Sequence, residues 1–138
     1  MKKTLFLVLL AIVCGFTNEL SAQIVYDYKV KTKENVADRT KMLDILRAKL
    51  YEEYRQEFIF AVDKLNVSGG YAWFQGVAKR EDGMPVQVDE NLDCCHVEAL
   101  MKVSKGKWYI VEMGAFSTDV WWDGLWERTD APKKIFFQ

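Results

Sequence analysis

The stretch VADRTKMLDILRAKLYEEYRQ, residues 36–56, decides how this chain folds. Its apolar residues recur at helical spacing on one side, while charged residues fill the other side. The apolar side consists of Met42, Leu43, Ile45, Leu46, Leu50 and Tyr54. No Gly or Pro interrupts the stretch, and Asn35 offers an N-cap, with Asp38 three residues later as in a capping box. We therefore predict one long amphipathic helix of about five turns.

Downstream of this helix the pattern changes from helical to alternating, which is typical of strands. Gly-containing turn signals separate the runs and predict a four-stranded antiparallel meander. The predicted strands are residues 58–67, 71–78, 95–103 and 108–116. A change of phase near Asp63-Lys64 predicts a β-bulge. Upstream of the helix, residues 23–33 are expected to form a loose leader or a short edge strand.

One long helix followed by a meander predicts an α+β fold, because a lone sheet face needs a covering layer and the helix supplies it. This element order resembles the cystatin-like or nuclear-transport-factor-like roll, in which a long helix lies in a curved sheet. Such a resemblance implies a fold and leaves the function to be argued from the site.

Length and charge narrow the function classes. The chain has 138 residues, which suits one domain, and 50% of them are hydrophobic. Lys and Arg number 19 against 20 Asp and Glu, so the formal net charge is -1. Nucleic-acid binding requires a basic surface, and this balance argues against it. The composition also excludes a disordered or fibrous chain.

Residues 1–22 have the pattern of a secretory signal peptide. Lys2 and Lys3 precede the apolar run of residues 5–14, and the small residue Ala22 suits cleavage before Gln23. A membrane span needs about 20 apolar residues, and this run is shorter. We therefore predict a secreted or periplasmic protein without a membrane span, whose single domain comprises residues 23–138.

The cysteines and the single histidine predict neither a disulfide framework nor a metal site. Once Cys14 leaves with the signal peptide, only the adjacent Cys94 and Cys95 remain. Adjacent side chains on a strand point to opposite faces, so two thiols are expected. His96 follows them directly, but zinc ligands usually come from separated pairs. No cofactor is expected.

Two acidic residues are embedded in apolar runs and are candidate functional groups. Glu112 has the same strand parity as Trp108 and Ile110, which places a charge on a face expected to be buried. Such a group is either a tuned acid or base or one half of an ion pair, with Arg39, Lys64 and Arg128 as potential partners. Asp119 is expected to cap the turn into the following tryptophan-rich segment.

Aromatic residues crowd into the C-terminal segment. A short helix is expected there, with Ser117 or Thr118 as its N-cap. Trp121, Trp122 and Trp126, together with Arg128, could form a platform for a sugar ring, a peptide or a lipid. The alternative is that this segment covers the open face of the sheet, as a small domain without disulfides requires.

Several short motifs carry a resemblance to a known group of proteins. They are Arg39 with Leu43-Asp44, Gly70-Tyr71-Ala72-Trp73-Phe74, Glu81-Asp82-Gly83, Glu98-Ala99-Leu100, Gly106-Lys107-Trp108, Thr118-Asp119-Val120 and Ala131-Pro132-Lys133-Lys134-Ile135-Phe136. Together they resemble a family of small secreted bacterial proteins with no assigned activity. The resemblance extends from Arg39 to Phe136 and implies no catalytic residues.

These observations favour a secreted or periplasmic binding module for an unknown small molecule, glycan or protein. Its site is expected between the helix and the sheet or on the segment Trp121–Trp126. The alternative is a small nuclear-transport-factor-like enzyme with Glu112 or Asp119 as general base. A third interpretation is a protease inhibitor by analogy with cystatins, although the inhibitory Gln-x-Val-x-Gly loop is missing.

Overall fold

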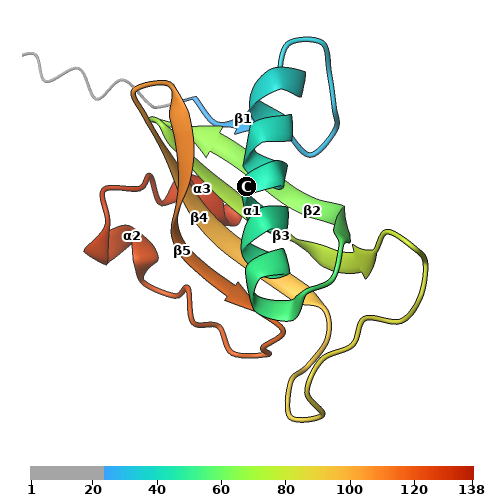
Figure 1. Ribbon diagram of the computed structural model, residues 1–138. Coiled ribbons are helices and arrows are strands. Elements are labelled where there is room, and N and C mark those ends of the chain that lie inside the picture. The colour runs from blue at the N-terminus through green and yellow to red at the C-terminus, as the bar shows by residue number, and fades with distance from the viewer. Residues whose placement is uncertain (1–23) are drawn as a thin grey trace, which may run out of the picture.

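The computed structural model describes residues 24–138 and confirms the α+β fold (Figure 1). In chain order its elements are β1 Tyr26–Asp27, α1 Val36–Tyr54, β2 Phe58–Ser68, β3 Tyr71–Arg80, β4 His96–Ser104, β5 Lys107–Ala115, α2 Leu125–Arg128 and α3 Lys134–Phe137. The sheet is antiparallel in the order β1-β2-β3-β4-β5. It has five strands rather than the predicted four because Tyr26 and Asp27 pair with Val67 and Asn66 at its edge.

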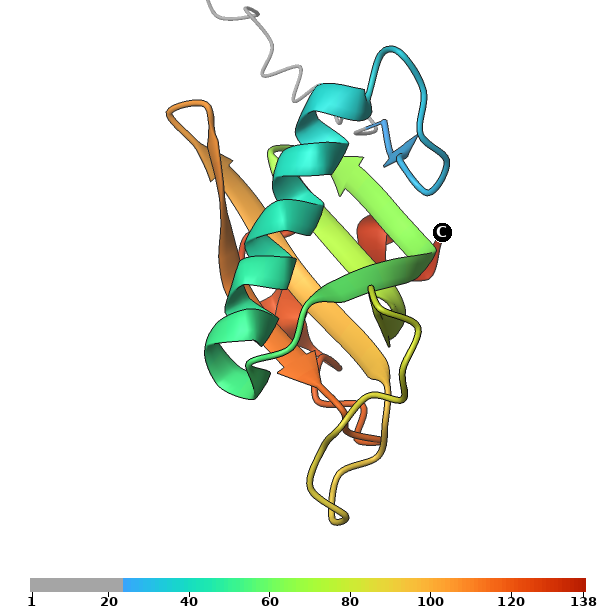
Figure 2. The same cartoon turned by 45° about the vertical axis from the view of Figure 1, so that its right-hand side comes forward.

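The sheet separates two layers of different origin. Figure 1 and Figure 2 show α1 crossing one face of the sheet, with α2 and α3 on the opposite face. We call these the helix face and the outer face. None of the helices within residues 24–138 has the length and apolar character needed to cross a membrane.

The helix α1 lies where its periodicity predicts and ends at Tyr54, two residues early. Arg55 adopts a left-handed conformation with φ of 55°, and its N–H bonds the carbonyl of Tyr51, which terminates the helix. Asn35 occupies the predicted N-cap position, but its side chain makes no capping hydrogen bond. The Asn35 side chain instead accepts a hydrogen bond from the N–H of Thr32 and donates one to the carbonyl of Val30, each over 2.9 Å. Asn35 therefore braces the loop before α1 rather than the helix end.

The helix face is a packed core. Met42, Leu46 and Leu50 are fully buried against apolar residues of the sheet. The sheet side of this core consists of Phe58, Leu65, Val67, Ala72, Phe74, Ala78, Val97, Ala99 and Met101, together with Phe116. Side chains thus occupy the space between α1 and the sheet, which argues against the ligand site expected there.

Two bulges control which side chains reach the outer face. The predicted bulge in β2 is confirmed between Val62 and Lys64. A second bulge in β5 was not predicted: Met101 pairs with Ile110 but Leu100 pairs with Glu112, so Val111 is an extra residue. A shift of one residue moves every later side chain of the strand to the opposite face of the sheet. The prediction that Glu112 shares a face with Ile110 is therefore wrong.

The outer face has its own core, built by the C-terminal segment. Buried residues of β3, β4 and this segment form it: Tyr71, Trp73, Leu100, Leu125, Ala131, Ile135 and Phe136. Asn66 of β2 donates hydrogen bonds of 2.8 Å to the carbonyls of Ile135 and Gln138, and Lys64 donates one of 3.0 Å to the carbonyl of Phe136. These bonds satisfy carbonyls that the short helix α3 leaves free.

The predicted cap of the tryptophan helix is also wrong. The helix α2 starts at Leu125, after Gly124 at a φ of 76°, and no side chain caps it. Trp121 and Trp122 lie in the turn that precedes α2. Gly124 supplies the left-handed backbone with which that turn ends, a conformation that favours glycine.

Cys94 and Cys95 form a disulfide between adjacent residues. The prediction of two thiols assumed that both cysteines lie on a strand and point to opposite faces. The strand β4 starts only at His96, and both cysteines belong to the turn before it, so the alternation of side chains does not apply.

Thiol titration tests this disulfide directly. The protein unfolded in denaturant without reductant should show no thiol from Cys94 and Cys95, and treatment with reductant should release two. A Cys94→Ser, Cys95→Ser variant is the control, because it should show neither thiol in either state. Two reactive thiols before reduction would contradict the pairing.

Candidate functional site

The three C-terminal tryptophans mainly cover the sheet. Trp122 lies 5.4 Å from Trp73 and 6.3 Å from Phe136, measured between ring centroids. Trp126 lies 5.4 Å from Phe136. Trp121 lies directly over Gly114, so that even a Cβ atom there would overlap its indole. All three are half-buried, and the covering role is the alternative that the structure favours over a free platform.

Glu112 and Arg128 form an ion pair on the outer face. The two charged groups are 3.4 Å apart and both side chains are about half exposed. Arg128 also donates to the carbonyls of Asp123 and Trp121 at 3.3 and 3.5 Å. The pair therefore braces the turn before α2, as the ion-pair interpretation of Glu112 proposed.

Asp119 lies on an exposed loop apart from these groups. Its backbone N–H bonds the hydroxyl of Ser117 over 3.1 Å. Its carboxylate accepts no hydrogen bond within residues 24–138, so the expected capping role of Asp119 is wrong in this part of the chain.

Glu98 is the acidic residue whose environment is unusual. It projects from β4 onto the outer face, where it pairs across the sheet with Gln75 and Gly114. The indole N–H of Trp121 lies 3.4 Å from its carboxylate. Burial raises the pKa of Glu98, while the Trp121 hydrogen bond and nearby His96 oppose that shift. Within residues 24–138 Glu98 has no ion-pair partner, which distinguishes it from Glu112.

Glu98 lines a cavity of about 450 Å³. The lining residues are Asp63, Gln75, His96, Glu98, Ser117 and Thr118, and we call this cavity the Glu98 pocket. Its floor is the part of the outer face that the C-terminal segment leaves open. Its far wall comes from the chain after Phe116, a buried residue at a φ of 58° whose N–H bonds the carbonyl of His96 over 2.8 Å. This anchor turns Ser117 and Thr118 toward the outer face.

The sequence contained only part of the signal for this pocket. The alternation along β4 already places His96 and Glu98 on one face. Asp63 lies 33 residues before His96, and the pair Ser117-Thr118 begins 19 residues after Glu98. The β2 bulge and the turn after β5 bring them to the same cavity.

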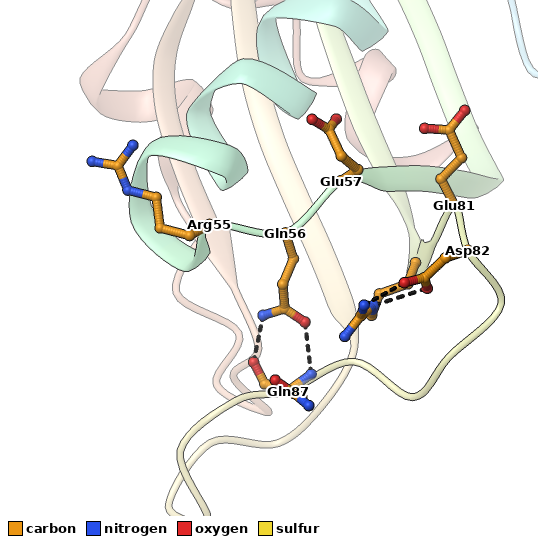
Figure 3. A pocket seen from close by; sticks show the side chains of 7 residues that line it. Arg55, Gln56, Glu57, Glu81, Asp82 and Gln87 are labelled. Carbon is orange, nitrogen blue, oxygen red and sulfur yellow. Dashed lines mark hydrogen bonds and ion pairs between the residues drawn. The ribbon is translucent and has the colours of Figure 1, made fainter.

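A second polar cavity of about 520 Å³ lies just beyond the C-terminal end of α1 (Figure 3). Its centre is occupied by an amide pair: Gln56 Nε2 donates to the carbonyl of Gln87 over 2.6 Å, and the N–H of Gln87 donates to Gln56 Oε1 over 2.8 Å. Arg80 is paired with Asp82 beside it. These polar groups are engaged with one another and tie the long β3–β4 loop to the end of α1, so we assign this cavity a structural role.

Metal binding has no support in the described part of the chain. Within residues 24–138 no group of three or more His, Cys, Asp and Glu side chains is placed to hold a metal ion.

The raised pKa of Glu98 predicts a stabilising substitution. Between the ordinary pKa of Glu and the raised value, the folded state binds the Glu98 proton more tightly than the unfolded state, so this group lowers stability as pH rises through that window. Glu98→Gln should therefore raise the free energy of unfolding at neutral pH, by no more than about 1 kcal/mol because solvent screens a half-buried group. Below about pH 4 the gain should vanish, since Glu98 is then protonated.

Urea unfolding of both proteins at several pH values measures this effect. Glu112→Gln is the matched control, because it removes a carboxylate that Arg128 pairs with and should stabilise the protein at no pH. A Glu98→Gln variant that is less stable than the parent at neutral pH would contradict the assignment.

Neither a protein-family model, nor a curated protein, nor a solved structure matches this chain. Its function is therefore inferred from the geometry of its own residues.

Proposed function

We propose that this protein is an exported, non-catalytic binding module that holds a small polar ligand in the Glu98 pocket. The export signal is residues 1–22, cleaved after Ala22, which lie outside the described residues and leave a secreted or periplasmic domain of residues 23–138. The order of one edge strand, a long helix and a four-stranded meander supports a cystatin-like or nuclear-transport-factor-like roll. The motifs quoted above support membership of a family of small secreted bacterial proteins.

One observation carries the proposal: a half-buried carboxylate that has no ion-pair partner within residues 24–138 lines a cavity of ligand size. Ligand pockets usually have volumes of about 300–1,000 Å³ and contain a few convergent polar groups. Glu98 is such a group, and Gln75, Ser117 and Thr118 add hydrogen-bonding side chains beside it. Burying Glu98 costs stability, and residues that cost stability concentrate at functional sites.

The tryptophan segment has a supporting role in this proposal. Trp121 donates its N–H toward Glu98 and so orients that carboxylate from outside the pocket. Trp122, Trp126 and Arg128 hold the turn that carries Trp121. The rings of Trp122 and Trp126 pack against those of Phe136 and Phe137, which supports a cover for the sheet more than a platform for glycans.

Nuclear magnetic resonance with a fixed set of probes tests the proposal. The ¹⁵N-labelled protein is titrated with methyl β-glucoside, glycerol, acetate, ethylammonium and acetamide, each alone. At least one probe should shift the amides of Gln75, His96, Glu98 and Thr118 in a saturable manner, and Glu98→Gln should weaken that binding. If no probe shifts these amides, or Glu98→Gln leaves binding unchanged, the proposal is wrong.

A second candidate is a small hydrolase in which Glu98, rather than Glu112 or Asp119, acts as general acid or base. The raised pKa of Glu98 and the neighbouring His96 favour it, since catalytic carboxyls require a pKa closer to the working pH. Glu112 is paired with Arg128, and Asp119 lies outside the pocket lining. Turnover of p-nitrophenyl acetate or p-nitrophenyl glycosides that Glu98→Gln abolishes would establish the enzyme and overturn the binding module.

A further inference from the structure

We infer that the ligand of the Glu98 pocket is a small organic cation bound through a primary alkylammonium group. This inference rests on the proposed function and names the chemistry of the ligand at the same site. It depends on the charges that line the pocket, on their counter-ions and on the hydrogen-bond acceptors beside them.

The charge of the pocket lining is negative. Asp63 and Glu98 are carboxylates, and neither Lys nor Arg from residues 24–138 lines the cavity. Among the described lining residues the basic side chain is that of His96, which is exposed to solvent on the same strand as Glu98. A cationic ligand therefore gains from both carboxylates, whereas an anion would be repelled.

Two cations close to the pocket, Lys64 and Arg128, bond other groups. Lys64 follows Asp63 directly, but its Nζ bonds the carbonyl of Phe136 over 3.0 Å. Arg128 bonds Glu112 and two backbone carbonyls of the turn before α2. Glu98 forms no ion pair within residues 24–138, and a ligand can supply the complementary positive charge.

The acceptors of the pocket suit an ammonium group. Glu98 uses Oε2 for the Trp121 N–H, which leaves Oε1 as an acceptor. The carboxylate of Asp63, the side-chain carbonyl of Gln75 and the hydroxyl oxygens of Ser117 and Thr118 are the other acceptors in the lining. An ammonium has three N–H donors and no acceptor, so it can satisfy such a set without leaving a donor of its own unpaired.

Competing ligand classes fit less well. A neutral alcohol can donate one hydrogen bond but leaves the half-buried charge of Glu98 uncompensated. A metal ion would require a cluster of ligands that residues 24–138 do not offer. A cavity of about 450 Å³ accommodates a small alkyl chain, which sets the size of the cation.

Three probes of four or five carbon atoms, a cation, a neutral alcohol and an anion, test the charge requirement. Butylammonium, 1-pentanol and pentanoate are titrated separately into the ¹⁵N-labelled protein at neutral pH. Butylammonium should shift the amides of Gln75, His96, Glu98 and Thr118 and saturate, with an affinity at least about tenfold above that of pentanol, the effect of one charge-assisted hydrogen bond. Pentanoate should leave these amides unchanged.

Variants separate a specific site from a general attraction of cations. Glu98→Gln should weaken butylammonium binding about tenfold, and Asp63→Asn should weaken it less, because Asp63 is exposed. Glu52→Gln removes one negative charge from α1, on the other side of the sheet, and should change nothing. The amide spectrum of each variant verifies that it is folded.

The source of the ammonium group is distinguished by a further titration. Nα-acetyl-lysine amide represents a lysine side chain of a protein partner, and butylammonium represents a free amine; tighter binding of either identifies the source. Equal binding of pentanol and butylammonium would overturn the cation inference but leave a ligand site at Glu98. Butylammonium binding that Glu98→Gln does not weaken would overturn both.

Discussion

Phe136→Ala should lower the free energy of unfolding by about 3–5 kcal/mol, the range for truncating a buried Phe. Phe136 is 1% exposed and its ring lies 4.7 Å from Trp73 and 5.4 Å from Trp126. The substitution leaves a void between the sheet and the tryptophan segment, on the side that α1 does not cover. Urea or thermal unfolding followed by tryptophan fluorescence measures the loss.

Phe137→Ala is the matched control for that loss. The neighbouring ring is 57% exposed, so its removal should change the free energy of unfolding by less than about 1 kcal/mol. If both substitutions have equal small effects, the C-terminal segment is a loose appendage rather than the second core of the domain. The Glu98 pocket would then lack the support that Trp121 receives from this segment.

The helix and the strands were predictable because their patterns are local. The apolar side of residues 36–54 repeats every turn, and Ser68-Gly69-Gly70 and Lys105-Gly106 supply the backbone that hairpin turns require. The β2 bulge was visible too, since the alternation of apolar residues changes phase there.

Other features depend on contacts between distant residues, which periodicity does not report. In β5 the residues Ile110, Val111 and Met113 are all apolar, so nothing in the pattern marks Val111 as extra, and Glu112 was placed on the wrong face. Asn35 has the residue type of an N-cap, but its side chain bonds the preceding loop instead.

The candidate site was harder to predict than the fold. Glu98 appeared as an ordinary polar residue of a half-exposed strand, because its burial comes from Trp121, 23 positions later in the chain. The density of tryptophans marks this segment in the sequence, although their main role is to cover the sheet, and the bond to that carboxylate comes from Trp121.

Gly114→Ala should destabilise the protein by about 1–3 kcal/mol, the usual effect of overpacking. The backbone of Gly114 is not left-handed, so what matters at this position is the lack of a side chain. A Cβ atom there would lie 2.9 Å from Trp121 Cδ1 and closer still to other atoms of the indole. The indole has to move away, and its N–H then leaves Glu98. We expect a red shift of tryptophan emission together with the loss of stability, both measured by fluorescence during urea unfolding.

A double-mutant cycle separates this clash from an intrinsic preference of the strand. In a Trp121→Ala background the obstacle is absent, and Gly114→Ala should become neutral or stabilising by up to about 1 kcal/mol, because Ala suits a strand better than Gly. The sign of the Gly114→Ala effect should therefore reverse between the two backgrounds. An equal destabilisation in both would mean that the backbone of β5, rather than the indole, requires glycine at this position. A reversal would tie Gly114 to the geometry of the Glu98 pocket, because the same indole that excludes a methyl group at Gly114 orients the carboxylate beside it.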